Sequence, residues 1–302
     1  MLIETFSLTK RYGQKTVLED VSFGMNAGEV VGLIGPNGAG KSTLIKLISG
    51  LIYPTSGKVM VDGYDVHSQH KIAFRKFGAI IEWPSFYADL TARQNLDLLS
   101  GGSGAAYQAR LQEVIALVGM ERHLNSKVNT FSTGMKQRLG IALALLPDSQ
   151  VIILDEPTNG LDPGGIVEIR EIIREFNRRY GTTVLVSSHL LGEIEQICDK
   201  IALIADGHLV AFGTLPDLLG DASEVKLAVN DPVLARSILE KEDAFRGRWS
   251  ERGEYWYFED GNDALASEIN RCLVTQGVLV KHLSVEQKDL EAFFLEKVRK
   301  SK

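Results

Sequence analysis

Short apolar runs alternate with amphipathic stretches along most of the chain. Glu29–Ile34, Val151–Leu154 and Thr183–Ser187 are short runs rich in apolar and β-branched residues, which is typical of buried strands. The stretches between them repeat apolar residues every three or four positions, as one face of a helix does. Strands that alternate with helices predict an α/β fold whose core contains parallel strands.

Additional strands surround this alternation at the N-terminus. Leu2–Leu8, Thr16–Phe23 and Lys58–Val61 each have strand character, and they predict an antiparallel β-subdomain. Residues 83–146 are mostly helical in pattern, with Thr91 placed as the N-cap of a helix, and predict a helical subdomain.

The pattern changes after residue 220. Strand and helix signals then follow in the order β-α-β-β-α-β, which a split-βαβ, ferredoxin-like domain would show. A last helix is expected to start at Ser284, because Ser284 and Gln287 have capping-box spacing. The sequence therefore predicts a large domain of residues 1–220 and a small α+β domain of residues 222–302.

Composition and charge limit the classes of function that this chain could have. The 302 residues are 44% hydrophobic and 24% charged, as in ordinary globular proteins, and the formal net charge is −6. The absence of long Lys or Arg runs argues against nucleic acid as the main partner. Cys198 and Cys272 form no C-x-x-C pattern and are expected to be reduced. No signal peptide and no apolar run of ~20 residues is present, so another chain would have to supply any membrane part.

One glycine-rich stretch matches the spacing G-x-x-x-x-G-K-[S/T] between a predicted strand and a predicted helix. It is Gly35-Pro36-Asn37-Gly38-Ala39-Gly40-Lys41-Ser42-Thr43. Backbone N–H groups at the helix start would bind phosphate, and the glycines would let the backbone approach it. Lys41 adds a positive charge, and the Ser42 hydroxyl is placed to ligate Mg²⁺. A glycine-rich turn that binds nothing is the alternative, which the flanking strand and helix disfavour. The stretch predicts a nucleotide phosphate site.

Three polar side chains follow buried strands. Asp155 and Glu156 come directly after Val151–Leu154, and His189 comes just after Thr183–Ser187. Ligands bind at the carboxyl ends of parallel strands, so Asp155 is expected to hold Mg²⁺ and Glu156 to polarise the attacking water. An exposed acidic turn and a structural histidine are the alternatives for isolated residues of these kinds.

Two further residues are assigned possible roles because of their position in the sequence alone. Tyr12 precedes the phosphate loop and could stack on a purine, or it could be a half-exposed hairpin residue. Asp162 could cap the helix Ile166–Tyr180.

Together these motifs resemble, in residue type and order, the nucleotide-binding subunit of an ATP-binding cassette (ABC) transporter. The most specific segment is Ser132-Thr133-Gly134-Met135-Lys136-Gln137-Arg138, which resembles the family signature L-S-G-G-Q/M-x-Q-R. The resemblance makes residues 1–220 the ATPase domain and implies a head-to-tail homodimer that sandwiches two ATP molecules. In that dimer Ser132, Thr133, Gly134, Met135 and Gln137 would face the ATP of the opposite protomer.

The same resemblance implies roles for the remaining residues. Tyr12 would stack on adenine, Glu156 would be the catalytic base, His189 would hold the γ-phosphate and Asp162 would lie at the dimer seam. ATP and Mg²⁺ would be the cofactors. A separate permease chain would hold the subunit on the cytoplasmic face of the cell membrane, and the aromatic loop Trp83–Tyr87 would meet it. Simple core filling is the alternative for that loop.

Two departures from the family pattern stand out. Phe131 and Thr133 replace the usual Leu and first Gly of the signature. Glu82 stands where the family usually has a Gln that contacts Mg²⁺ or the attacking water, so the resemblance makes Glu82 a candidate Mg²⁺ ligand beside Ser42 and Asp155. A glutamate here, with an added C-terminal domain, resembles the bacitracin- and lantibiotic-resistance exporters, which implies export of a drug, peptide antibiotic or lipid-like substrate.

Two other functions stay open at this point. A soluble ABC-type ATPase acting on nucleic acid or ribosomes usually has two cassettes, a long coiled-coil insertion or zinc-binding cysteines, and this chain has none of these. A non-hydrolysing regulatory cassette is disfavoured because the candidate phosphate, metal and catalytic residues are all present, namely Lys41, Ser42, Asp155, Glu156 and His189.

Overall fold

The computed structural model describes residues 1–302 apart from 76, 220–222, 288–289 and 301–302. Contacts divide the chain into two compact units, Met1–Leu215 with Glu296–Lys302, and Pro216–Leu295. The boundary expected from the sequence, between residues 220 and 222, lies outside the described residues.

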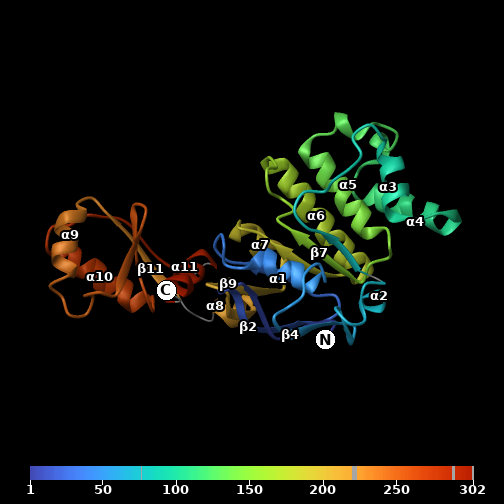
Figure 1. Ribbon diagram of the computed structural model, residues 1–302. Coiled ribbons are helices and arrows are strands. Elements are labelled where there is room, and N and C mark those ends of the chain that lie inside the picture. Colours follow the sequence, from blue (N-terminus) through green and yellow to red (C-terminus); the bar gives the residue numbers. More distant parts are fainter. Residues whose placement is uncertain (76, 220–222, 288–289, 301–302) are drawn as a thin grey trace. The chain divides into compact units, whose positions relative to one another are not determined.

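A mixed sheet forms the centre of the first unit (Figure 1). Its strands are β3 (Val30–Ile34), β6 (Phe77–Ile80), β7 (Val151–Asp155), β8 (Thr183–Ser187), β9 (Lys200–Ala205) and β10 (His208–Thr214). They lie in the order β10-β9-β3-β8-β7-β6, and all neighbours are parallel except β10 and β9. Every residue of β3, β7 and β8 is buried, as expected for parallel strands covered on both faces. Their carboxyl ends therefore meet at one edge of the sheet.

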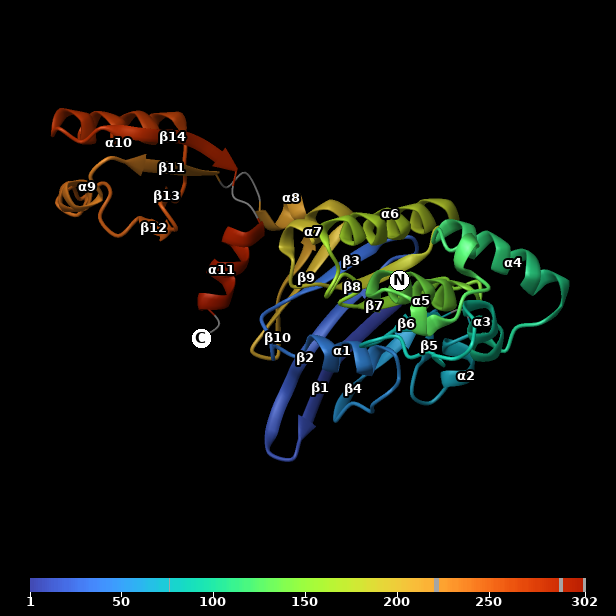
Figure 2. The same cartoon turned by 90° about the horizontal axis from the view of Figure 1, so that it is seen from above.

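An antiparallel sheet forms a second layer of this unit. Its strands are β1 (Ile3–Tyr12), β2 (Lys15–Met25), β4 (Ser56–Val61) and β5 (Tyr64–Asp65), in the order β2-β1-β4-β5. This confirms the predicted antiparallel subdomain, with β1 and β2 longer than expected because their pairing continues to the turn at Gly13. Helix α1 (Lys41–Ile48) packs between the two sheets and buries Leu44, Ile45, Leu47 and Ile48 in their shared core (Figure 2).

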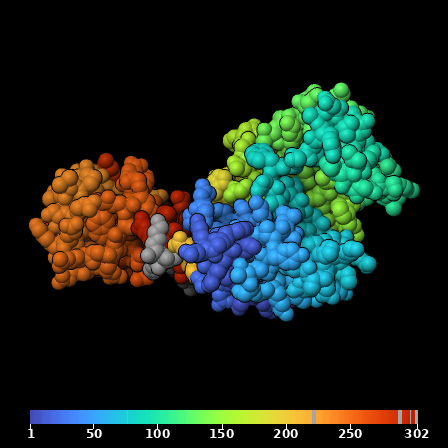
Figure 3. All heavy atoms as spheres, viewed as in Figure 1, coloured from blue at the N-terminus to red at the C-terminus, as the bar shows by residue number. Residues whose placement is uncertain are grey.

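The remaining helices of the first unit lie mainly on the other side of the central sheet and beyond its β6 edge (Figure 2). They are α2 (His70–Ala73), α3 (Ala92–Ser100), α4 (Gly104–Leu117), α5 (Thr133–Leu145), α6 (Pro163–Tyr180) and α7 (Leu191–Ile197). Short 3-10 helices span Glu121–His123 and Val128–Thr130. The predicted N-cap of α3 is confirmed, because the Thr91 hydroxyl accepts a hydrogen bond from the Gln94 N–H at 3.1 Å. In the space-filling view, α3, α4 and α5 form a teal and green lobe beside the blue N-terminal segment (Figure 3).

The C-terminal unit contains a second antiparallel sheet. Its elements are β11 (Ser223–Val229), α9 (Pro232–Leu239), β12 (Trp249–Arg252), β13 (Tyr255–Phe258), α10 (Asp263–Thr275) and β14 (Val280–Gln287). The strand order β12-β13-β11-β14, with antiparallel neighbours throughout, is that of the split-βαβ sheet which the element order predicted. Apolar residues of α9 and α10 pack on this sheet, and together they form the hydrophobic core of the C-terminal unit. The helices α8 (Leu215–Leu219) and α11 (Leu290–Lys300) stand at either end of these elements in sequence.

The predicted start of the last helix is wrong. Ser284 lies inside β14, opposite Lys226 of β11, and α11 begins at Leu290. The capping-box spacing is a local signal, whereas pairing with β11 satisfies the backbone groups of β14 as far as Gln287. The strand therefore continues through the position where the helix was expected.

Candidate functional site

The predicted phosphate loop joins the end of β3 to the start of α1. Gly35 has φ +158°, and a Cβ there would lie 2.2 Å from the carbonyl oxygen of Ile204. Gly40 has φ +111°, and a Cβ there would lie 2.6 Å from the Leu18 side chain. Packing within the protein therefore requires glycine at both positions. The sequence had suggested a different reason, which is that glycine lets the backbone approach an anion.

Lys41 and other residues of this loop line a cavity of about 300 Å³. The Lys41 side chain is buried, and its Nζ donates hydrogen bonds to the carbonyl oxygens of Gly35 at 2.7 Å and Pro36 at 3.3 Å. Burial lowers the pKa of Lys41, while the carboxylates of Glu156 and Asp155 act in the opposite direction. The lining residues are Val17, Asn37, Gly38, Gly40, Lys41, Ser42, Thr43 and Glu156.

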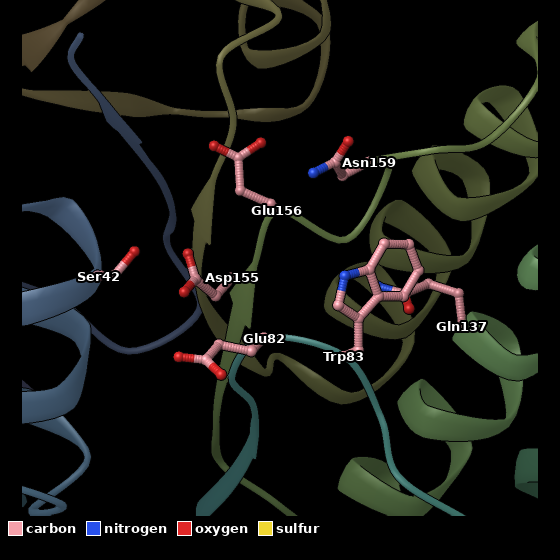
Figure 4. Close-up of a pocket in the computed structure, with 7 residues that line it drawn as sticks. All are labelled: Ser42, Glu82, Trp83, Gln137, Asp155, Glu156 and Asn159. Atoms are coloured by element: carbon pink, nitrogen blue, oxygen red, sulfur yellow. The ribbon is translucent and has the colours of Figure 1, made fainter. Parts of the chain in front are cut away.

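A second cavity of about 310 Å³ adjoins the first, because Ser42 and Glu156 line both. The carboxylates of Asp155 and Glu82 share it with the Ser42 hydroxyl, although the three residues come from different parts of the chain (Figure 4). Its lining residues are Ser42, Glu82, Trp83, Gln137, Asp155, Glu156 and Asn159. The fold therefore gathers the candidate metal ligands and the candidate base around one space.

Ser187 connects Asp155, the last residue of β7, with Glu156, which follows it. Its hydroxyl donates to Asp155 Oδ1 at 2.6 Å and accepts from the Glu156 N–H at 2.8 Å. Glu156 has φ +50°, a left-handed conformation that is uncommon for a residue with a Cβ. Ser187 lies opposite Asp155 in the pairing of β8 with β7. The sequence did not identify this residue, because its role depends on which strands are neighbours.

His189 and Glu156 are in direct contact. His189 Nδ1 lies 2.6 Å from Glu156 Oε2, and the two residues follow the ends of neighbouring strands. The arrangement brings together the two side chains that the sequence assigned to the base and to the γ-phosphate.

The signature segment begins helix α5. The Ser132 hydroxyl accepts a hydrogen bond from the Met135 N–H at 3.3 Å and so caps the helix. Thr133 is exposed, whereas Gly134 and Met135 are half-buried. Gln137 is 3% exposed and lines the cavity of its own chain, where its Oε1 has no hydrogen-bond partner among the described residues.

Asp162 is confirmed as a helix cap. Its Oδ1 accepts a hydrogen bond from the Gly165 N–H at 3.0 Å, and α6 begins at Pro163, before the expected Ile166. Tyr12 lies at the end of β1 with half of its surface exposed, and Lys10 Nζ lies 4.9 Å from its ring centroid. As far as the described residues go, neither of the two cavities is lined by Tyr12.

Glu82 forms an ion pair that the sequence did not reveal. Its Oε1 lies 2.8 Å from Nζ of Lys46, and the backbone of Glu82 has φ +64°. The hydrogen bond with Lys46 lowers the pKa of Glu82, and it raises the pKa of Lys46 in turn. Lys46 lies one helical turn after Ser42, a spacing visible in the sequence, but its partner is far away along the chain.

Comparison with known proteins decides the family. The family model described as "ABC transporter" matches residues 18–159. The bacitracin transport ATP-binding protein BcrA of Enterococcus faecalis is 35% identical over 294 residues, which cover 97% of this chain and 95% of that protein. The chain belongs to the ATP-binding proteins of ABC transporters.

Other relatives of this ABC ATPase agree with that assignment. The lantibiotic transport ATP-binding protein SrtF of Streptococcus pyogenes is 41% identical over 209 residues, covering 69% of this chain and 89% of SrtF. A solved dimeric ATP-binding cassette in a post-hydrolysis state, bound to ADP and Pi, superposes with a TM-score of 0.64 at 28% identity. That match covers 70% of this chain and 98% of the cassette. The chain is thus an ATPase that binds ATP and ADP and hydrolyses ATP.

The site of this ABC ATPase has the oxygen donors that Mg²⁺ prefers. Ser42 and Asp155 line one cavity, and Ser187 fixes one oxygen of Asp155. Among the residues that the structure describes, no group of three or more His, Cys, Asp or Glu side chains could hold a metal ion by itself. The Ser42 hydroxyl and the Asp155 carboxylate, with the Glu82 carboxylate in the same cavity, fit Mg²⁺ that takes its other ligands from nucleotide phosphates and water.

Proposed function

We propose that the chain powers an exporter of a drug, a peptide antibiotic or a lipid-like substrate. The observation that supports this most is the match to BcrA, whose name assigns it to bacitracin transport. The match extends over 97% of this chain, so it includes the C-terminal unit as well as the ATPase core. SrtF, whose name assigns it to lantibiotic transport, supports the same substrate class.

ATP would bind with its phosphates over the loop Gly35–Thr43. Lys41 would neutralise phosphate charge, and Ser42 and Asp155 would hold Mg²⁺, which when bound would stabilise the charge on the phosphate oxygens. Glu156 would orient the attacking water and accept its proton. The 2.6 Å contact with His189 supports this role, because it fixes the carboxylate beside the cavity.

The adenine and the γ-phosphate would meet the residues that the family resemblance suggested. Tyr12 would stack on adenine, and its half-exposed ring leaves a face for this. His189 would reach the γ-phosphate through the ring nitrogen that is not paired with Glu156.

The working form would be a head-to-tail homodimer. Ser132, Thr133, Gly134 and Met135 lie at the start of α5, where the helix dipole favours an anion, and in the dimer they would face the ATP of the opposite protomer. Asp162 would lie at the seam. The solved cassette with a TM-score of 0.64 is itself dimeric, which supports this arrangement.

A separate integral-membrane permease would carry the substrate. Within the described part of the chain, no helix combines the length and the apolar character needed to cross a membrane. Trp83 and Tyr87 each expose 57% of their surface and would contact the permease. The subunit would then sit on the cytoplasmic face of the cell membrane.

The proposed transport function is tested in cells that lack the gene. Loss of the chain is expected to raise sensitivity to bacitracin or to a lantibiotic, and the wild-type gene should restore resistance. Glu156→Gln, produced at the same level, should not restore it. Unchanged sensitivity of the deletion strain to the whole peptide-antibiotic panel would contradict the proposed substrate class.

A further inference from the structure

Helix α1 (Lys41–Ile48) presents two polar side chains to the site. Ser42 and Lys46 are four residues apart, so they leave the same face of the helix. Ser42 lines the cavity that also contains Asp155, and Lys46 reaches the Glu82 carboxylate at 2.8 Å. Figure 4 shows this carboxylate turned toward the α1 side of the cavity.

The backbone at Glu82 needs a contact that holds it. Its φ of +64° is unfavourable for a residue with a Cβ, and such conformations persist where neighbouring contacts fix them. Trp83 comes next in the chain and lies close to Gly160, where a Cβ would be 3.3 Å from the Trp83 ring. Because Trp83 follows Glu82 directly, a change in the Glu82 backbone would move the Trp83 ring relative to Gly160.

Charge supplies a second reason for the ion pair. Glu82 shares its cavity with the carboxylates of Asp155 and Glu156. A polyphosphate beside three carboxylates would be repelled, and a cation within hydrogen-bond distance of one of them reduces that repulsion. Lys46 is the cation that contacts Glu82.

We propose that Lys46 is a positioning residue, which fastens the loop of Glu82 and Trp83 to α1 and offsets the Glu82 charge so that a nucleoside triphosphate can bind. The inference rests on the proposed placement of ATP over the loop Gly35–Thr43. Lys46 acts through Glu82, and Lys41 remains the lysine assigned to the phosphates.

The charge effect is tested by ATP affinity in EDTA at low ionic strength, where surface charges are least screened. Lys46→Met should weaken binding about two- to fivefold, Glu82→Gln should strengthen it, and the double variant should bind as the wild type does. Lys71→Met, an exposed lysine on α2, is the control for overall charge and should change nothing.

Two results would overturn this part of the inference. One is Lys46→Met binding like the wild type. The other is a double variant as weak as Lys46→Met, which would make Lys46 a phosphate ligand. A wild-type chain without ATP affinity would instead overturn the proposed nucleotide site itself.

The positioning effect is tested by Trp83 fluorescence without nucleotide. The chain has three tryptophans, and the other two, Trp249 and Trp256, stack on each other in the C-terminal unit. The emission of Trp83 is therefore obtained by subtracting the spectrum of Trp83→Phe, in which only the other two tryptophans emit. Lys46→Met and Glu82→Gln should shift the Trp83 emission alike, and the exchange Lys46→Glu with Glu82→Lys should restore it. Unchanged emission in both single variants would show that the ion pair does not hold the loop.

Discussion

The hydroxyl of Ser187 contacts both acidic residues at the end of β7, Asp155 and Glu156. It bonds the side chain of Asp155 and the backbone of Glu156, and Ser187 is itself fully buried at the end of β8. Loss of this hydroxyl would leave the partly buried N–H of Glu156 without this partner and free the Asp155 carboxylate to rotate. The positions proposed for Mg²⁺ beside Asp155 and for the attacking water beside Glu156 would then both become less well defined.

Ser187→Ala should therefore lower kcat about tenfold and destabilise the protein by about 1–2 kcal/mol. Ser149→Ala is the matched control, because Ser149 is also buried and its hydroxyl donates to the Ala144 carbonyl away from the site. Steady-state ATPase assays and urea unfolding separate the two effects. Equal kcat values in the two variants would show that Ser187 is merely structural.

At the residue scale, motif spacing was enough to find the residues that flank strand ends and helix starts. Lys41, Ser42, Asp155 and Glu156 are brought together around two adjoining cavities. Ser187 and Lys46 could not be found in this way, since each contacts a partner more than thirty residues away. Strand order and loop position, which a single sequence does not encode locally, bring these pairs together.

At the scale of elements, the buried strands of the central sheet were predicted well because both of their faces are covered. Their apolar runs leave little ambiguity, as in β7 and β8. The error at Ser284 has the opposite origin, because β14 is a half-exposed strand whose extent is set by its pairing with β11. A local capping signal cannot report such a partner.

One contact between elements of the central sheet should make stability depend on pH. Glu29, just before β3, accepts hydrogen bonds at 2.7 Å from Lys200 and from Asn26. Burial would raise the pKa of Glu29, but these bonds outweigh it and lower the pKa below its usual range. Its stabilisation is therefore complete above the unfolded-state pKa near 4.5 and is lost as pH falls through the lower folded-state value.

Glu29→Gln should accordingly cost about 1 kcal/mol of unfolding free energy at pH 7 and progressively less as the pH falls below 4.5. Urea unfolding of both proteins across this pH range measures the difference. A constant difference at all pH values would mean that the carboxylate charge plays no part.

At the scale of the molecule, each unit has its own hydrophobic core. The order of elements predicted the sheet of the C-terminal unit, because four strands and two helices in that order have few ways to bury their apolar faces. The assignment of Glu296–Lys302 to the first unit was not foreseen, since it depends on contacts distant in sequence.

Removal of residues 216–302 should leave a folded chain that binds ATP, because the cavities above the phosphate loop are lined by residues of Met1–Leu215. Circular dichroism and ATP titration of the shortened and complete chains provide the test. A shortened chain that does not fold would mean that the first unit depends on the segment removed.

The most direct test of the account is single-turnover and steady-state ATP hydrolysis by Glu156→Gln, with light scattering of the same sample. The variant keeps the shape of the side chain but loses the carboxylate that would orient water. We expect it to bind Mg-ATP, to turn over ~10²–10⁴ times more slowly and to accumulate as an ATP-bound dimer. Hydrolysis at the wild-type rate would contradict the assignment of Glu156 as the base.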